Sequence, residues 1–158
     1  MALPKYAQWE IERRWLVEPR AVESLELGPP REIEDVYLPG TGLRLRKLSE
    51  AGAPPVFKLC KKYGKSVGRS EAITNLYLTE AEYTLLRSAL DGQRVRKVRR
   101  AVAGGSLDLY PGAPSLAVFE IEFDSEDAAA TYVPPDFVTV EVTTHPAYSG
   151  ASLAGRGS

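Results

Sequence analysis

Residues 9–17 constrain this chain more than any other segment, because charged and apolar residues alternate along them. In an extended strand, successive side chains point to opposite faces. One face would carry Glu10, Glu12, Arg14 and Leu16, and the other would carry Ile11, Arg13, Trp15 and Val17. A strand usually turns its apolar face to a core and its charges to water. The charged face of this strand is therefore left to line water or a wet, charged cavity.

The same pattern returns in four more segments, each with like charges two or four residues apart on one face and apolar residues beside them. These segments are 43–46, 56–62, 96–99 and 119–124. Like charges directly opposed across a sheet destabilise it. Since some segments are basic and others acidic, we expect them to complement each other, or to complement ions and a ligand.

Strands dominate the pattern of the whole chain. The expected strands are 9–17, 33–39, 42–49, 55–62, 69–78, 94–102, 105–110, 116–124 and 137–144. One helix starts at a capping box, with Thr79 as N-cap and Glu82 three residues later, and ends at Asp91–Gly92. Shorter helices are expected at 125–130 and 19–27. Many short strands with charged inner faces indicate a closed barrel or a strongly curved sheet, with the apolar residues packed outside against the helices.

Composition narrows the classes of protein. A length of 158 residues suits one domain over 1–158, in which the small, polar residues 149–158 suggest a disordered or truncated tail. A net charge of −1 gives no reason to expect nucleic acid or a membrane as partner. Cys60 is the one cysteine and the N-terminus lacks a signal-peptide core, so we expect a cytoplasmic protein. We expect it to be either a monomer or a homodimer.

Ordered motifs along the chain resemble those of the CYTH, or triphosphate tunnel metalloenzyme, superfamily, in particular its short bacterial inorganic triphosphatases. Residues 10–14 resemble the Glu-x-Glu-x-Lys signature, 43–46 the Arg-x-Arg strand, 97–99 the Lys-x-Arg strand and 120–122 the second Glu-x-Glu. Further matches, in order, are 35–38, 58–64, 73–83, Asp108 and 141–154. One such motif alone is weak, but the ordered set is specific. It implies a mainly β fold, an eight-stranded antiparallel tunnel with a charged interior and a few outer helices.

The resemblance also implies metal-dependent hydrolysis of inorganic triphosphate, a small-molecule substrate, inside the tunnel. The residues implied as catalytic are Glu10, Glu12, Arg14, Glu120 and Glu122. Those implied to bind substrate are Arg14, Arg44, Arg46, Lys58, Lys62, Lys97 and Arg99. Those implied to bind metal are Glu10, Glu12, Asp108, Glu120 and Glu122. The chemistry agrees, because phosphates need cationic donors while clustered carboxylates need a cation, and all-oxygen ligands select Mg²⁺ or Mn²⁺.

Two departures from the family pattern stand out. Arg14 replaces the signature lysine, and a guanidinium cannot share a lysine's role in proton transfer. The short C-terminus leaves open whether a helix covers one mouth of the tunnel. The alternative functions are a class IV adenylyl cyclase, a thiamine or nucleoside triphosphatase, and a non-catalytic polyphosphate-binding module.

For several other residues we expect a structural role or a surface position. Cys60 is expected to fill space on the inner face, Trp9 and Trp15 to pack, and Asp35 and Tyr37 to serve structure. His145 precedes a proline beyond the last strand and is expected in a turn. Glu71 is either a tunnel residue or a partner of Arg69. Residues of the opposite parity are expected on the surface, namely Arg13, Lys61, Arg94, Arg96 and Arg100.

Overall fold

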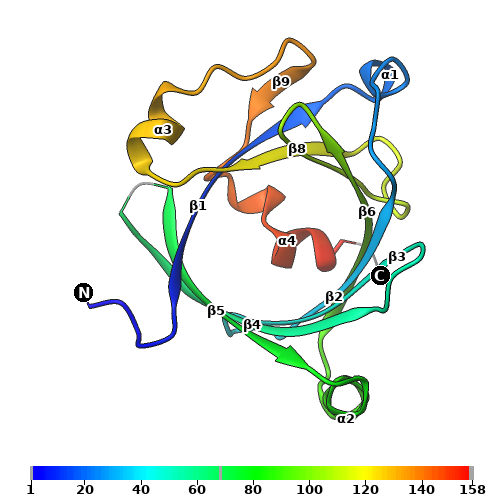
Figure 1. Cartoon of the computed structure of the whole chain (residues 1–158), viewed down its shortest axis with the longest axis vertical. Helices are drawn as coiled ribbons and strands as arrows, with labels where there is room; N and C mark the ends of the chain where they lie inside the picture. Colours follow the sequence, from blue (N-terminus) through cyan, green and yellow to red (C-terminus); the bar gives the residue numbers. More distant parts are fainter. Residues whose placement is uncertain (1, 68, 157–158) are drawn as a thin grey trace.

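The computed structural model describes residues 2–67 and 69–156, which form a closed antiparallel β-barrel (Figure 1). Neighbouring strands follow the order β5-β4-β3-β2-β6-β7-β8-β1, and β5 pairs with β1 to close the ring. The strands are β1 (Gln8–Val17), β2 (Arg31–Tyr37), β3 (Leu43–Glu50), β4 (Val56–Val67), β5 (Ser70–Leu78), β6 (Gln93–Val102), β7 (Gly105–Leu109) and β8 (Ala117–Glu122). A ninth strand, β9 (Val138–Glu141), pairs with the C-terminal end of β1. The predicted fold class is confirmed.

Strand register places the charged residues inside the barrel. Glu12 lies opposite Glu122, and Arg14 lies opposite Glu120, across the β1–β8 pair. On the other side of the ring, Asp35 of β2 lies opposite Arg46 of β3. Since directly paired residues share a face, the alternation read from the sequence fixes one continuous charged inner surface.

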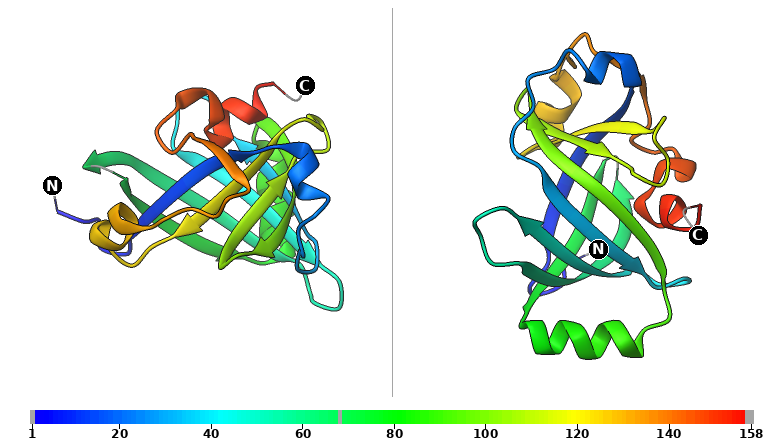
Figure 2. Two further views of the ribbon diagram at one scale, coloured as in Figure 1. Left: turned by 90° about the horizontal axis from the view of Figure 1, so that it is seen from above. Right: turned by 90° about the vertical axis from the view of Figure 1, so that its right-hand side faces the viewer.

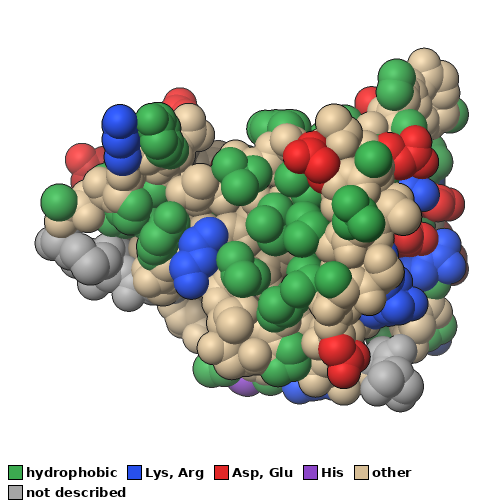
Figure 3. Space-filling view, turned by 90° about the horizontal axis from the view of Figure 1, so that it is seen from below, with side chains coloured by type: hydrophobic (Ala, Val, Ile, Leu, Met, Phe, Trp, Pro, Cys, Tyr) green, Lys and Arg blue, Asp and Glu red, His purple; other side chains and the backbone are tan. Residues whose placement is uncertain are grey.

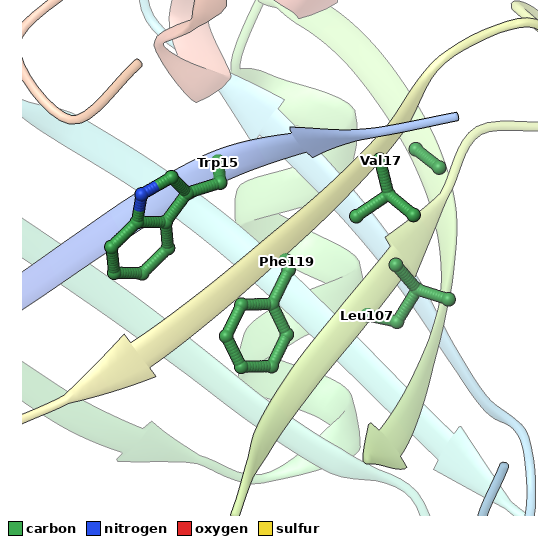
Figure 4. Packing of buried hydrophobic residues seen from close by; sticks show 5 residues of the cluster. Trp15, Val17, Leu107 and Phe119 are labelled. Carbon is green, nitrogen blue, oxygen red and sulfur yellow. The ribbon is translucent and has the colours of Figure 1, made fainter. Parts of the chain in front are cut away.

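The apolar residues pack on the outside of the barrel, as the sequence predicted. One cluster consists of Trp15, Val17, Leu107, Ala117 and Phe119, most of which Figure 4 shows pointing to the same outer side. The rings of Trp15 and Phe119 lie 5.9 Å apart. Helix α1 (Pro19–Val22) and the segment that carries Tyr132 and Phe137 cover this cluster. Burial of such side chains contributes roughly 1.5–3 kcal/mol each.

Helix α2 (Glu80–Ala89) covers a second outer cluster, made of Val36, Leu45 and Phe57 with Tyr83 from the helix itself. The predicted capping box is present, because Thr79 Oγ1 accepts a hydrogen bond from the Glu82 amide and the Glu82 carboxylate accepts one from the Thr79 amide. This fixes the start of α2 at the end of β5. The face at the bottom of Figure 1 shows hydrophobic side chains spread over its centre (Figure 3), as outward-facing apolar residues require.

The prediction that Arg13 lies on the surface is wrong. It does point outward, but helix α3 (Glu126–Thr131) and β9 fold over it and leave it 9% exposed. Its Nε and Nη2 donate to the two carboxylate oxygens of Glu141, each at 2.8 Å, and its Nη1 donates to the carbonyl of Ala129. A segment distant in sequence supplies all of these acceptors.

The C-terminal residues form a short 3₁₀ helix η1 (Pro146–Tyr148) and helix α4 (Gly150–Ala154), so the segment 149–158, for which the sequence suggested a disordered or truncated tail, contains a helix. In Figure 1 they project onto the centre of the ring, and in the left view of Figure 2 they lie above the strands. Leu153 of α4 is buried against Tyr110 and Val118 at this end of the barrel. A Cβ on Gly150 would lie 2.0 Å from the Tyr37 hydroxyl, so glycine permits this close approach.

No helix in the described ranges is long and apolar enough to cross a membrane.

Candidate active site

The inside of the barrel holds a charged cavity of about 830 Å³, a size typical of small-molecule sites. The cationic residues of the inner strand faces that line it are Arg14, Arg44, Arg46, Lys62, Lys97 and Arg99. The glutamates that line it are Glu10, Glu12, Glu71, Glu120 and Glu122. The rest of the wall comes from Tyr37, from residues 40–42 between β2 and β3, from 61, 63 and 64 of β4, and from 143–146 and 149–151 near the C-terminus.

One half of the barrel wall alternates basic and acidic strands in the order β3-β2-β6-β7. Asp35 of β2 accepts two hydrogen bonds of 2.7 Å from Nε and Nη2 of Arg46 on β3. Asp108 of β7 accepts one of 2.6 Å from Lys97 Nζ and two, of 2.7 and 2.8 Å, from Arg99, both on β6. The side chains of both aspartates are fully buried. This half, the basic wall, thus presents cations to the cavity with aspartates beside them.

The opposite half, the acidic wall, gathers glutamates on the neighbouring strands β8, β1 and β5. Glu120 accepts from Arg99 Nη2 and lies 3.7 Å from Nε of Arg14. At the seam, Lys62 Nζ of β4 lies 2.8 Å from Glu10 and 3.5 Å from Glu71. Glu71 is therefore a tunnel residue, and the open question from the sequence is resolved.

Glu12 is the least compensated carboxylate of the acidic wall. It makes no hydrogen bond to any residue in the described ranges, and its cross-strand partner is another glutamate, Glu122. Burial, followed by the negative charges of Glu120 and Glu10, raises the pKa of Glu12 to about 7. Burial and the same two neighbours also raise the pKa of Glu122. The nearby cations, Lys62 and Arg14 for Glu12 and Arg99 and Lys62 for Glu122, only partly offset this, so a further cation would stabilise the charged forms.

The aspartates of the basic wall behave in the opposite way. Burial opposes ionisation of Asp108, but Lys97 and Arg99 outweigh it and hold the pKa of Asp108 well below its usual value. The same holds for Asp35, where hydrogen bonds from Arg46 lower the pKa despite burial. Both aspartates are therefore ionised and are neutralised by their arginine and lysine partners.

Two of the arginines that line the cavity each have a donor without a partner in the described part of the chain. Nε of Arg14 and Nε of Arg44 are buried without a hydrogen-bond partner among the described residues. Nη1 of Arg14 donates to the Tyr148 carbonyl at 2.6 Å, which ties β1 to the C-terminal segment. The ion pairs of the described residues do not include Arg44, although it lies beside the Tyr37 hydroxyl. A buried donor without a partner is costly, so both groups are suited to an oxygen-rich ligand.

The structure brings most of the predicted site residues to one cavity and separates two of them from it. Within the described part of the chain, Lys58 and Asp108 are not among the lining residues. Lys58 has its Nζ 5.2 Å from the ring of Tyr77, and Asp108 lies against the cations of β6. Parity along a strand predicts the face of a residue but not its depth along the tunnel.

Some lining residues escaped the sequence analysis. Tyr37 and Lys61 line the cavity, although the first was expected to be structural and the second to lie on the surface. His145 also lies at its edge, where its Nδ1 accepts from the Ala147 amide in the expected turn. Cys60 is fully buried, as predicted. Tyr37 and Lys61 lie on β2 and β4, whereas His145 lies beyond the last strand, where no alternating pattern could have revealed it.

The acidic wall fits a hard divalent cation by the chemistry of its donors. Its carboxylates supply only oxygen ligands, and the unpartnered Glu12 favours a cation beside it. Within the described ranges, no three His, Cys, Asp or Glu side chains are already clustered as a metal site. Glu10 and Glu120 are engaged by Lys62 and Arg99, so they would have to exchange these partners for a metal ion.

A closed antiparallel barrel with a charged interior in place of a packed core defines a tunnel-type binding protein. Comparison with known proteins agrees, although no protein-family model matches the chain. The chain is 33% identical over 153 residues to the inorganic triphosphatase of Nitrosomonas europaea, across 92% of this chain and 96% of that protein. The crystal structure of the inorganic triphosphatase NE1496 matches with a TM-score of 0.54 at 27% identity, covering 92% of this chain and 93% of that one.

A second structure, of the hypothetical protein NE1496, matches with the same TM-score of 0.54 at 29% identity and covers 92% of this chain and 97% of that one. The chain therefore belongs to the CYTH, or triphosphate tunnel metalloenzyme, superfamily. The resemblance seen in its ordered motifs is confirmed. Its relationship to a triphosphatase places it among the hydrolases.

Proposed function

We propose that this protein hydrolyses inorganic triphosphate to pyrophosphate and phosphate with the help of a divalent cation, Mg²⁺ or Mn²⁺. The observation that carries the proposal is the division of the cavity into a basic wall and an acidic wall. A triphosphate carries several negative charges, so it needs many cationic donors. The carboxylates would repel it unless a cation lay between them and the phosphate groups. The relative in Nitrosomonas europaea, named an inorganic triphosphatase, supports this substrate.

The basic wall would bind and orient the phosphate chain. Arg44, whose Nε has no hydrogen-bond partner among the described residues, and Arg46 lie on β3. Lys97 and Arg99 lie on β6, which pairs with the other edge of β2. Guanidinium groups bind phosphate oxygens through two parallel hydrogen bonds, which fixes orientation as well as charge. Their fixed charges would stabilise the equatorial and leaving oxygens as the terminal P–O bond breaks.

The acidic wall would hold the cation and take up the proton. Glu10, Glu12, Glu120 and Glu122 would bind the metal ion, whereas Asp108, also predicted as a ligand, does not line the cavity and is held by Lys97 and Arg99. Such an ion, when bound, neutralises phosphate charge and lowers the pKa of a coordinated water. Water attacks the terminal phosphorus, pyrophosphate leaves, and the water loses a proton. A glutamate of this wall that does not coordinate the ion would accept that proton.

Arg14 cannot have the proton-transfer role that a lysine at this position could have. Its guanidinium stays protonated, so it cannot transfer a proton. Its position between Glu120 and the Tyr148 carbonyl, with Nε unused, suits a fixed donor to a phosphate oxygen. We also infer a cytoplasmic location, since Cys60 is the single cysteine of the sequence and is free, as is usual in a reducing compartment.

Phosphate release tests the proposal directly. Tripolyphosphate, ATP and thiamine triphosphate are compared side by side with Mg²⁺, with Mn²⁺ and with EDTA. We expect fast release from tripolyphosphate that EDTA abolishes, and slower release from the other two. No release from tripolyphosphate, together with cyclic AMP in the ATP samples, would replace the triphosphatase with an adenylyl cyclase. Tight binding of tripolyphosphate without release in either metal would leave a binding module.

A further inference from the structure

Asp35 combines deep burial with an unusually complete ion pair. It is 1% exposed, lies directly opposite Arg46 in the β2–β3 register, and binds Nε and Nη2 of that guanidinium at 2.7 Å each. Arg46 itself lines the cavity, while Asp35 is not among the described lining residues. The arginine therefore lies between a buried carboxylate on one side and the cavity on the other.

We propose that Asp35 is a positioning residue, which holds the Arg46 guanidinium in the orientation that binds a phosphate group of the substrate. The proposal rests on the proposed function for its substrate class, a polyphosphate. It deepens that function by assigning a role to a residue that never touches the substrate.

The hydrogen-bond geometry supports this role. The pair uses Nε and Nη2, the side of the guanidinium that forms a two-pronged contact with a carboxylate. Nη1 makes no hydrogen bond to any described residue, so it remains as a donor on an arginine that lines the cavity. A fixed plane decides where Nη1 points, and a small error in that direction weakens contact with a phosphate oxygen.

The surrounding charges show why Arg46 needs to be held. Arg44 and Lys97 both lie close enough to Asp35 to lower its pKa, so three cations surround one carboxylate. Like charges repel, and without Asp35 the flexible Arg46 side chain would turn away from its neighbours. Aspartate suits the position because its short side chain reaches a directly opposed arginine without entering the cavity.

The negative charge of Asp35 and its hold on Arg46 have opposite effects on the affinity for tripolyphosphate. Replacing Asp35 with asparagine removes a negative charge from the basic wall, so charge alone would tighten the binding of a polyanion. Loss of orientation would weaken it instead. Binding of tripolyphosphate therefore separates the two explanations.

The experiment measures tripolyphosphate binding by calorimetry in EDTA, with hydrolysis measured separately in Mg²⁺. We expect Asp35→Asn to weaken binding about tenfold, in the range seen for coupled members of one ion-pair network, and to raise KM more than it lowers kcat. Glu141→Gln is the matched control, because Glu141 makes the same two-pronged contact with Arg13 on the outer face and glutamine keeps an acceptor for Thr143. This control should leave binding unchanged.

A double-mutant cycle shows whether Asp35 acts through Arg46. In an Arg46→Gln background, Asp35→Asn should have no further effect on binding. The double variant also keeps the test valid if Asp35→Asn alone fails to fold, since it leaves no buried charge unpaired. Unchanged or tighter binding by Asp35→Asn, or weaker binding by the double variant than by Arg46→Gln, would overturn the proposal.

The outcomes also separate this proposal from the proposed function. Binding of tripolyphosphate by the wild-type protein without hydrolysis would remove the triphosphatase and leave the role of Asp35 standing. Hydrolysis by the wild type with full binding by Asp35→Asn would remove only the role of Asp35. Failure of the wild type both to bind tripolyphosphate in EDTA and to hydrolyse it in Mg²⁺ would overturn both, and if the wild type hydrolyses it without binding it in EDTA, the KM of Asp35→Asn decides the role of Asp35.

Discussion

Replacing Glu12 with glutamine is expected to stabilise the metal-free protein while removing its activity. The pKa of Glu12 is about 7 in the folded protein, against an ordinary value of 4.5. Between pH 4.5 and 7 the folded protein keeps a proton that the unfolded chain has already released. Stability therefore falls as pH rises through this window, and the full penalty is present above pH 7. Glutamine has the shape of the protonated side chain and carries no such penalty.

The size of the effect follows from the pKa difference. One pKa unit corresponds to about 1.36 kcal/mol, so the ceiling for Glu12 is roughly 3 kcal/mol. Partial solvent contact and coupling to the neighbouring glutamates reduce this figure, and we expect roughly 2 kcal/mol at pH 8. For a protein of this size that gain raises Tm by roughly 4–8 °C. At pH 4.5 the wild type and the variant should differ little, because Glu12 is then protonated in the folded state.

Thermal unfolding in EDTA, followed from pH 4.5 to pH 8.5, measures this difference. Glu32→Gln serves as the control, because Glu32 is exposed on the outer face of β2 and its replacement removes the same charge. The control should keep the pH dependence of the wild type. A lower Tm for Glu12→Gln at pH 8, or an equal shift at pH 4.5 and pH 8, would refute the view that Glu12 is an uncompensated buried carboxylate.

Three further predictions concern the two walls and the C-terminal helix. Glu122→Gln should weaken metal binding and therefore lower kcat with Mg²⁺ more than about tenfold. Calorimetric titration with Mn²⁺ should show the weaker affinity. An affinity for Mn²⁺ equal to that of the wild type would contradict the metal assignment. Arg44→Ala should raise KM for tripolyphosphate by about tenfold or more, since a charged hydrogen bond contributes about 1.5–3 kcal/mol, and steady-state kinetics that instead show a fall confined to kcat would argue against it. Leu153→Ala should destabilise the protein by about 2–4 kcal/mol, seen as a lower urea midpoint, whereas a midpoint equal to that of the wild type would mean that α4 does not pack as described.

The fold was predictable because its signal is local. Alternation along β1, β3, β6 and β8 assigns each charged side chain to one face, and closure of the sheet then makes that face an interior. The strands from the structure agree with the predicted ranges to within a few residues, apart from a longer β4. The capping box at Thr79 is equally local and fixes the start of α2.

Features that depend on distant segments were not predictable in the same way. Arg13 has the parity of a surface residue, and only the folding of α3 and β9 over β1 buries it. Lys58 and Lys62 share a face, yet they lie at different depths, so Lys62 reaches Glu10 while Lys58 lies near Tyr77. Alternation carries no information about depth, or about which loops meet at the mouth of the barrel.

The ion pairs of the tunnel also determine what a ligand must do to enter it. Lys62 and Arg99 each join a carboxylate of the acidic wall, so the cavity partly neutralises itself. A phosphate that draws these cations away leaves Glu10 without Lys62 and Glu120 with only its longer contact to Arg14, and a buried charge that loses its partner is strongly destabilising. Those glutamates then need another cation. The arrangement thus favours a polyanion and a divalent cation entering together over either one alone, whereas the pair between Asp35 and Arg46 can stay intact throughout.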